Sequence, residues 1–209
     1  MSSLGISVEE LVTTILYTLQ DEDFVRWSRS EIDSYINEAQ FFLLEADINA
    51  FTVRKEHKCD NGVLQEVPNI ERILEIENVK TIDRVTMDAV RPFWRSEKSS
   101  PRPEFVIFNE LDDKSFFVYP PASSNPSITL LVQVKPQTIK SDGSTMNETV
   151  IPVKHSYFHA LMNFVLYRCY DKDADDAFNA QRAQQYLSAA YQALNIKTNQ
   201  VVESNPNID

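Results

Sequence analysis

The chain has 209 residues, a formal net charge of -11 and a composition that is 43% hydrophobic and 24% charged, which is typical of a globular protein. The excess of acidic residues excludes tight binding to a nucleic-acid backbone, because such binding comes from lysine and arginine displacing counterions. An acidic wall would instead repel DNA and let it slide past. No apolar run approaches the roughly 20 residues that span a bilayer, and the first residues do not resemble a signal peptide. We therefore expect a protein made in the cytoplasm, with no membrane association and with its two cysteines as free thiols.

Two amphipathic helices are predicted at the start of the chain, over residues 7–19 and 28–46. Ser7 and Ser28, the first residue of each segment, are followed three residues later by a glutamate. At this capping-box spacing each side chain satisfies a backbone donor at the start of the helix. Apolar residues then recur with the 3.6-residue period of a helix that buries one face.

The pattern changes between residues 51 and 135 to short runs rich in Val, Ile, Phe and Tyr, bounded by turn residues. We count six or seven strands, enough for a small antiparallel sandwich or barrel. A short helix capped by Thr86 is expected to end near Pro92. Three successive strand pairs are predicted: 51–58 with 63–67 around Asn61-Gly62, 73–79 with 81–85, and 104–109 with 115–119.

Helical periodicity returns over residues 153–170 and 174–194. The two terminal helix pairs are expected to pack on one another, because a lone amphipathic pair leaves much of its apolar stripe in water. The predicted fold is therefore α+β, a four-helix bundle formed by the N- and C-terminal helix pairs with an inserted antiparallel β-sandwich or barrel. The expected parts are the discontinuous bundle over 1–48 and 151–195, the β domain over 49–150, and a polar C-terminal tail over 196–209.

No constellation of residues indicates catalysis or metal binding. His155 and His159 have the four-residue spacing that lets two imidazoles reach one zinc ion, but no third ligand accompanies them, so we favour a surface or interface role. His57 and Cys59 share one face of a predicted strand, which is a weak metal or nucleophile signal. Cys169 is more typical of a small buried hydrophobe.

Other chemical signatures are missing from the sequence. The acidic run at 171–176 lacks the glycine and terminal glutamate of a calcium loop, and the three glycines are not clustered into a phosphate cradle. We expect no catalytic residue, no cofactor and no metal. Two alternatives stay open: an enzyme whose paired carboxylates come from distant strands, and a monomeric protein-binding module or assembly chaperone that recognises its partner through the β domain.

Four stretches, in order along the chain, resemble one known family. They are WSRSEIDSYINEAQ at 27–40, IDRVTMDAVRPFW at 82–94, SFFVYPP at 115–121 and YFHALMNFVLYRCYDKDADDAFNAQRAQQYLSAAYQAL at 157–194. The family is that of the head-to-tail adaptor (connector) proteins of short-tailed, podovirus-type phages, and the resemblance covers about residues 19–194.

The resemblance implies a structural virion protein at the head-tail junction, made in the cytoplasm of the host bacterium. Its implied partners are the portal protein, the tail nozzle and further copies of itself in a dodecameric ring. Viral DNA would pass through the ring without sequence-specific binding, and the ring would help to retain the genome.

A ring subunit needs two complementary faces, and exposed aromatic residues are common anchors in such interfaces. We predict that Trp94 and Tyr191 are exposed and serve as anchors. We also predict that the C-terminal tail becomes ordered on the portal. The tail residues expected to bind are Ile196, Val201, Val202, Asn205 and Ile208.

Overall fold

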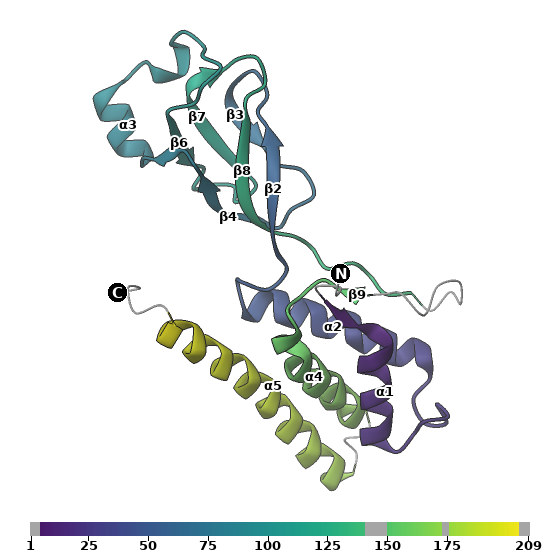
Figure 1. Cartoon of the computed structure of the whole chain (residues 1–209). Helices are drawn as coiled ribbons and strands as arrows, with labels where there is room; N and C mark the ends of the chain where they lie inside the picture. The colour runs from purple at the N-terminus through teal and green to yellow at the C-terminus, as the bar shows by residue number, and fades with distance from the viewer. Residues whose placement is uncertain (1–4, 141–149, 173–175, 205–209) are drawn as a thin grey trace. The chain divides into compact units, whose positions relative to one another are not determined.

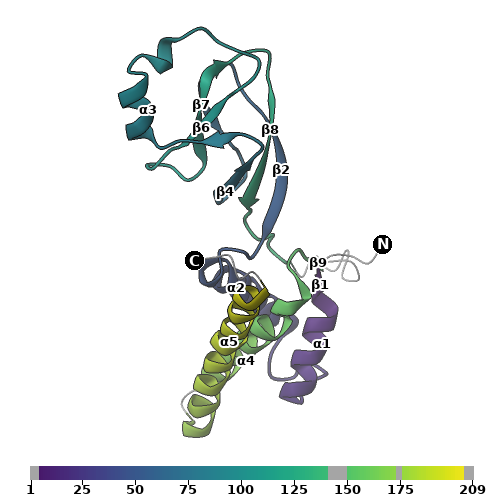
Figure 2. The ribbon, with the colours of Figure 1, turned by 60° about the vertical axis from the view of Figure 1, so that its left-hand side comes forward.

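The computed structural model describes residues 5–140, 150–172 and 176–204, with side chains described as far as 194. The chain divides into two compact units, one formed by residues 1–50 with 136–209 and the other by residues 51–135. Figures 1 and 2 show helices in the first unit and two sheets with a short helix in the second. The fold is mixed α+β, as the sequence predicts.

The described part of the first unit contains four helices, and one of them, α4, contacts the other three. The four are α1 (Val8–Leu19), α2 (Arg29–Ala46), α4 (Phe158–Asp171) and α5 (Ala177–Ser204). α4 packs against α1, α2 and α5, and both views show α5 running alongside α4. The two ends of the chain therefore fold together, because the apolar stripes of α1 and α2 are covered by α4.

Three short elements of the first unit were not predicted from the sequence. β1 (Ile6–Ser7) pairs antiparallel with β9 (Val150–Ile151), and the 3-10 turn η2 (His155–Tyr157) precedes α4. Ile6 and Ile151 are opposite each other in this ladder and both are buried. The pairing ties the first residues of α1 to the chain that leads into α4.

The helices α1 and α2 begin at the predicted caps. The Ser28 hydroxyl accepts the Glu31 backbone N–H, and the Glu31 carboxylate accepts the Ser28 backbone N–H at 3.0 Å, so this capping box is complete. The Ser7 hydroxyl accepts the Glu10 N–H at the start of α1. Glu31 also pairs with Lys172 just after α4, and this hydrogen bond, with those from Ser28, lowers the pKa of Glu31 to about 2.

The last helix differs from the prediction. α5 continues to Ser204, about ten residues beyond the predicted end, so residues 196–204 are helical and not a tail. The segment lacks apolar periodicity, but it contains no Pro or Gly before Pro206 that would stop a helix already in progress. Extending an existing helix adds one hydrogen bond per residue without a new nucleation cost, which explains the extension.

The second unit contains two sheets. The first has the order β2-β8-β4 and the second β3-β7-β6-β5, and all neighbours are antiparallel except β5 and β6. The strands are β2 (Thr52–Lys58), β3 (Gly62–Glu66), β4 (Arg72–Glu77), β5 (Lys80–Thr81), β6 (Phe105–Phe108), β7 (Ser115–Ala122) and β8 (Ser127–Gln133). One core joins both sheets. It includes Ile73, Ile76, Val106, Phe116, Val118, Ile128, Leu130 and Val132.

Two of the three predicted strand pairs are wrong. β2 pairs with β8 and not with β3, and β4 also pairs with β8, while the third pair, β6 with β7, is confirmed. The turn at Asn61-Gly62 is closed instead by a side chain, since the Gln65 amide accepts the Asp60 N–H at 2.7 Å and donates to the Asp60 carbonyl at 3.0 Å. β2 and β4 pair with the two edges of β8, whose apolar side chains lie in the core. The free energy of burying these distant strands together outweighs the local preference for a hairpin at Asn61-Gly62.

A helical excursion follows β5 and covers the outer face of the second sheet. It consists of α3 (Arg84–Val90) and the 3-10 turn η1 (Trp94–Ser96). Its N-cap is Asp83, whose carboxylate accepts the Thr86 N–H at 2.8 Å, and not Thr86 as predicted. The excursion starts earlier than expected because Asp83 supplies the capping acceptor.

Candidate functional site

The two aromatic residues predicted as exposed anchors differ in their surroundings. Trp94 is 0% exposed, so the prediction of an exposed anchor is wrong for this residue. Its ring lies edge-on to Phe117 and its indole N–H donates to Asp88 at 2.7 Å. Tyr191 on α5 is half exposed, with its ring packed edge-on against Phe42 at 5.2 Å between centroids. The ring of Tyr191 is therefore held by Phe42 on one side and exposed to solvent on the other.

The predicted tail residues fall partly within α5. The backbone of Ile196, Val201 and Val202 belongs to this helix, whereas Asn205 and Ile208 lie outside the described residues. The portal-binding role of these five residues remains a prediction.

The histidine pair is separated by an aromatic ring. His155 stacks on Phe158 at 5.4 Å, while His159 meets the same ring edge-on at 5.8 Å. Within the described parts of the chain, no group of three or more His, Cys, Asp and Glu residues could hold a metal ion. In the same residues no helix is both long and apolar enough to cross a membrane.

The remaining candidates are buried. His57 packs edge-on against Phe116, and burial lowers its pKa. Neither Cys59 nor Cys169 is in a disulfide, both are fully buried, and burial raises the pKa of Cys59 to about 11. A thiol that is shielded from solvent does not reach a reaction partner, so both cysteines pack the core.

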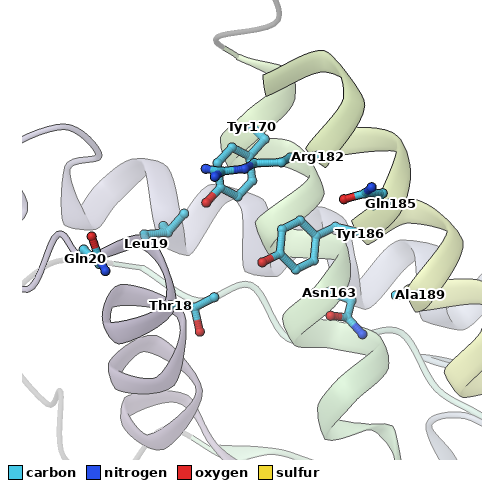
Figure 3. A pocket seen from close by; sticks show the side chains of 9 residues that line it. All are labelled: Thr18, Leu19, Gln20, Asn163, Tyr170, Arg182, Gln185, Tyr186 and Ala189. Atoms are coloured by element: carbon cyan, nitrogen blue, oxygen red, sulfur yellow. The ribbon is translucent and has the colours of Figure 1, made fainter. Parts of the chain in front are cut away.

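The first unit contains an open groove between α1 and α5, floored by α4, with a volume of about 570 Å³ (Figure 3). Its lining residues come from all three helices: Thr18, Leu19 and Gln20 from the end of α1, Asn163 and Tyr170 from α4, and Arg182, Gln185, Tyr186 and Ala189 from α5. No local pattern in the sequence indicates this groove, because its residues are scattered over three helices that meet only in the fold.

An aromatic and cationic cluster forms one wall of the groove. The rings of Tyr170 and Tyr186 stack with centroids 5.5 Å apart and planes 5° apart, and the Arg182 guanidinium lies 5.5 Å above Tyr170. Figure 3 shows these three side chains projecting from α4 and α5. Burial raises the pKa of Tyr186, so its phenol stays protonated. The cluster offers hydrogen-bond donors and a positive charge, which suits binding of a polar or acidic chain better than catalysis.

The middle of α5 carries unusually little charge for so acidic a chain. No charged residue occurs between Arg182 and Lys197. A second shallow hollow on this helix is lined by uncharged residues: Gln181, Gln184, Gln185, Ser188, Ala189 and Gln192. Depletion of charge is a mark of the inner part of protein interfaces. This uncharged stretch and the exposed part of Tyr191 form a surface that is suited to contact another protein.

Comparison with known proteins gives the context for these surfaces. No curated protein compared with the chain matches it. The chain does match the family described as SU10 adaptor protein, over residues 6–208. That match includes both units, and it agrees with the resemblance carried by the four sequence stretches. The chain therefore belongs to the SU10 adaptor protein family, a family of phage head-to-tail adaptors and structural components of the virion.

Proposed function

We propose that this protein forms a ring between the portal and the tail nozzle at the head-tail junction, through which viral DNA passes and which helps to retain the genome. The observation that carries the proposal is the family match over residues 6–208. The same proposal includes a ring of twelve subunits, with the portal and the nozzle as its partners. It also includes the description of the two units as a four-helix bundle and a β-sandwich.

Charge supports the proposed channel. The helical unit carries 18 acidic and 8 basic residues, whereas the β unit carries 13 acidic and 12 basic residues. A wall that carries the negative charge of the helical unit repels the phosphate backbone and does not hold it. A passage for DNA needs such a surface, because a basic lining would bind the genome and slow its movement.

The uncharged stretch of α5 and the groove beside it supply surfaces for protein partners. We assign the portal contact to the C-terminal half of α5, including Tyr191, and to the residues that follow. The backbone of α5 stays helical as far as Ser204, beyond the predicted end at 194. A helix already formed also loses less conformational entropy on binding than a disordered tail.

The proposal is tested by mixing the purified protein with purified portal and examining the product by cryo-electron microscopy. We expect a symmetric ring of adaptor subunits on one end of the portal. A matched pair of variants, Tyr191→Ala on α5 and Leu111→Ala in a loop of the β unit, should show reduced and unchanged binding, respectively. A protein that stays unbound at saturating portal, or binds as single copies, would instead favour a monomeric binding module or chaperone.

A further inference from the structure

A single aromatic side chain stands out on the surface of the β unit. Phe93, between α3 and η1, is 80% exposed, although its neighbour Trp94 is fully buried. Met87 and Trp94 fasten the excursion to the second sheet, where they share a cluster with Ile107 and Tyr119. Phe93 is therefore an apolar knob on a fixed base, and such rigid aromatic residues are typical interface anchors.

The surroundings of the knob are basic, in contrast to the chain as a whole. Residues 83–102 contain five Arg and Lys against three Asp and Glu. The guanidinium of Arg91 lies 5.1 Å from the Tyr119 ring centre, and that of Arg95 lies 4.2 Å from the Trp94 ring centre. Arg91 also pairs with Glu97 at 3.3 Å and Arg95 with Asp88 at 3.1 Å, so the segment keeps a net charge of +2 and not two unpaired arginines. The knob is thus suited to an apolar hollow with an acidic rim.

The helical unit contains such a hollow. It has a volume of about 260 Å³ and lies between α1 and the loop that leads to α2. Val12, Leu16, Tyr17 and Phe24 give it apolar and aromatic walls, and Glu9 and Glu22 lie at it together with Arg29, which pairs with Glu9 at 2.7 Å and with Asp33 at 2.9 Å. A cavity of roughly 150 Å³ is enough to hold a benzene ring, so this hollow accommodates a phenylalanine side chain.

The loop between α1 and α2, which forms one wall of this hollow, is fixed by hydrogen bonds within the chain. The Asp21 carboxylate accepts the backbone N–H groups of Val25, Arg26 and Trp27, at 2.8, 3.0 and 3.0 Å. These bonds close a tight loop in which Phe24 adopts a positive φ of 56°. A preformed hollow loses little entropy when a ligand enters it.

From these observations we infer that Phe93 of one copy inserts into the hollow formed by Val12, Leu16, Tyr17 and Phe24 of the next copy, with the net positive segment around Phe93 facing the net negative rim of the hollow. The inference rests on the proposed ring and names the contact between its subunits. Knob and hollow are different surfaces of one chain, so the contact is heterologous, and its repetition around an axis closes a ring.

The inference is tested by disulfide trapping between two separately purified variants, Phe93→Cys and Tyr17→Cys. A disulfide requires Cα atoms within about 7 Å, so a covalent heterodimer forms only where the two positions meet. The native cysteines are buried and do not compete. The matched control replaces Phe93→Cys by Leu111→Cys, because Leu111 is another exposed apolar site of the same unit, 89% exposed.

We expect at least about tenfold more heterodimer from the Phe93→Cys pair than from the control pair. The yield should also fall on addition of salt, because the charges around the contact are at the surface. Equal yields from the two pairs overturn the inference. So does a double variant, with both substitutions in one chain, that closes an intrachain bond at high dilution.

Trapping on purified portal separates this inference from the proposed function. A ring that assembles on portal without the Phe93–Tyr17 crosslink leaves the function standing and refutes the contact. A heterodimer that is trapped with high yield, from a protein that never binds portal, supports the contact and refutes the function.

Discussion

Met87 provides the most direct test of how the knob is supported. Its side chain is 2% exposed and packs with Trp94, Ile107 and Tyr119 on the second sheet. Replacing it with alanine removes about three buried methylene-sized groups at about 0.8 kcal/mol each and leaves a cavity that the sheet cannot fill. We expect Met87→Ala to lower the free energy of unfolding of the β unit by about 2.5–4 kcal/mol. Val85→Ala, on the exposed side of the same helix, should stay within about 0.5 kcal/mol of the parent.

The measurement is urea unfolding followed by tryptophan fluorescence. The chain has two tryptophans, one in each unit, so Trp27→Phe is introduced into parent and variants to leave Trp94 as the reporter of the β unit. Met87→Ala should also reduce the yield of the Phe93→Cys crosslink, because α3 then loses the buried side chain that packs it against the second sheet. Equal midpoints for Met87→Ala and Val85→Ala would refute the assignment of Met87 as the buried anchor.

Further predictions concern buried polar groups. Burial acts to raise the pKa of Asp21, but three backbone N–H bonds outweigh it and hold the pKa below 3.8. The stability that this carboxylate contributes is therefore present above pH 3.8 and lost as the pH falls below it. In urea unfolding, Asp21→Asn should be less stable than the parent at neutral pH, and the difference in unfolding free energy should shrink in acid. Burial and the hydrogen bond to Asp47 raise the pKa of Tyr157 well above 10, so its stabilisation is lost as the pH rises beyond 10. Tyr157→Phe should cost about 1.5–3 kcal/mol at neutral pH and unfold with a weaker alkaline dependence, measured by circular dichroism. Cys59 should not react with an aromatic disulfide reagent in the native protein at mildly alkaline pH and should react fully in denaturant; rapid native labelling would contradict its burial.

The helical unit is the part of the fold that the sequence predicts best. Both capping serines and the apolar stripes of α1, α2 and α4 are local patterns, and each corresponds to a helix within a few residues of the predicted limits. The end of α5 escaped prediction because residues 195–204 have no apolar face. Their helical state depends on continuation from the packed part of the helix and not on their own pattern.

The candidate site was predicted less well, and the two neighbouring residues Phe93 and Trp94 show why. Both are aromatic, both follow Pro92, and the sequence does not indicate which one faces the sheet. Trp94 was predicted to be the exposed anchor, yet it is the buried one, because its ring packs on Phe117 and its N–H reaches Asp88. Phe93, which has no polar atom to pair, is left on the surface.

Local patterns in the sequence were enough to predict the α+β class, the two capped helices at the start of the chain, the helical pair at its end, the strand-rich middle and the adaptor resemblance, because each of these depends on residues close together in the chain. Tertiary structure alone decided that β8 takes both β2 and β4 as partners, that Tyr170, Arg182 and Tyr186 meet in one groove, and that Phe93 is presented to solvent. Those outcomes depend on which distant apolar faces bury one another, and the free energy of that burial exceeds the local preferences that a sequence displays.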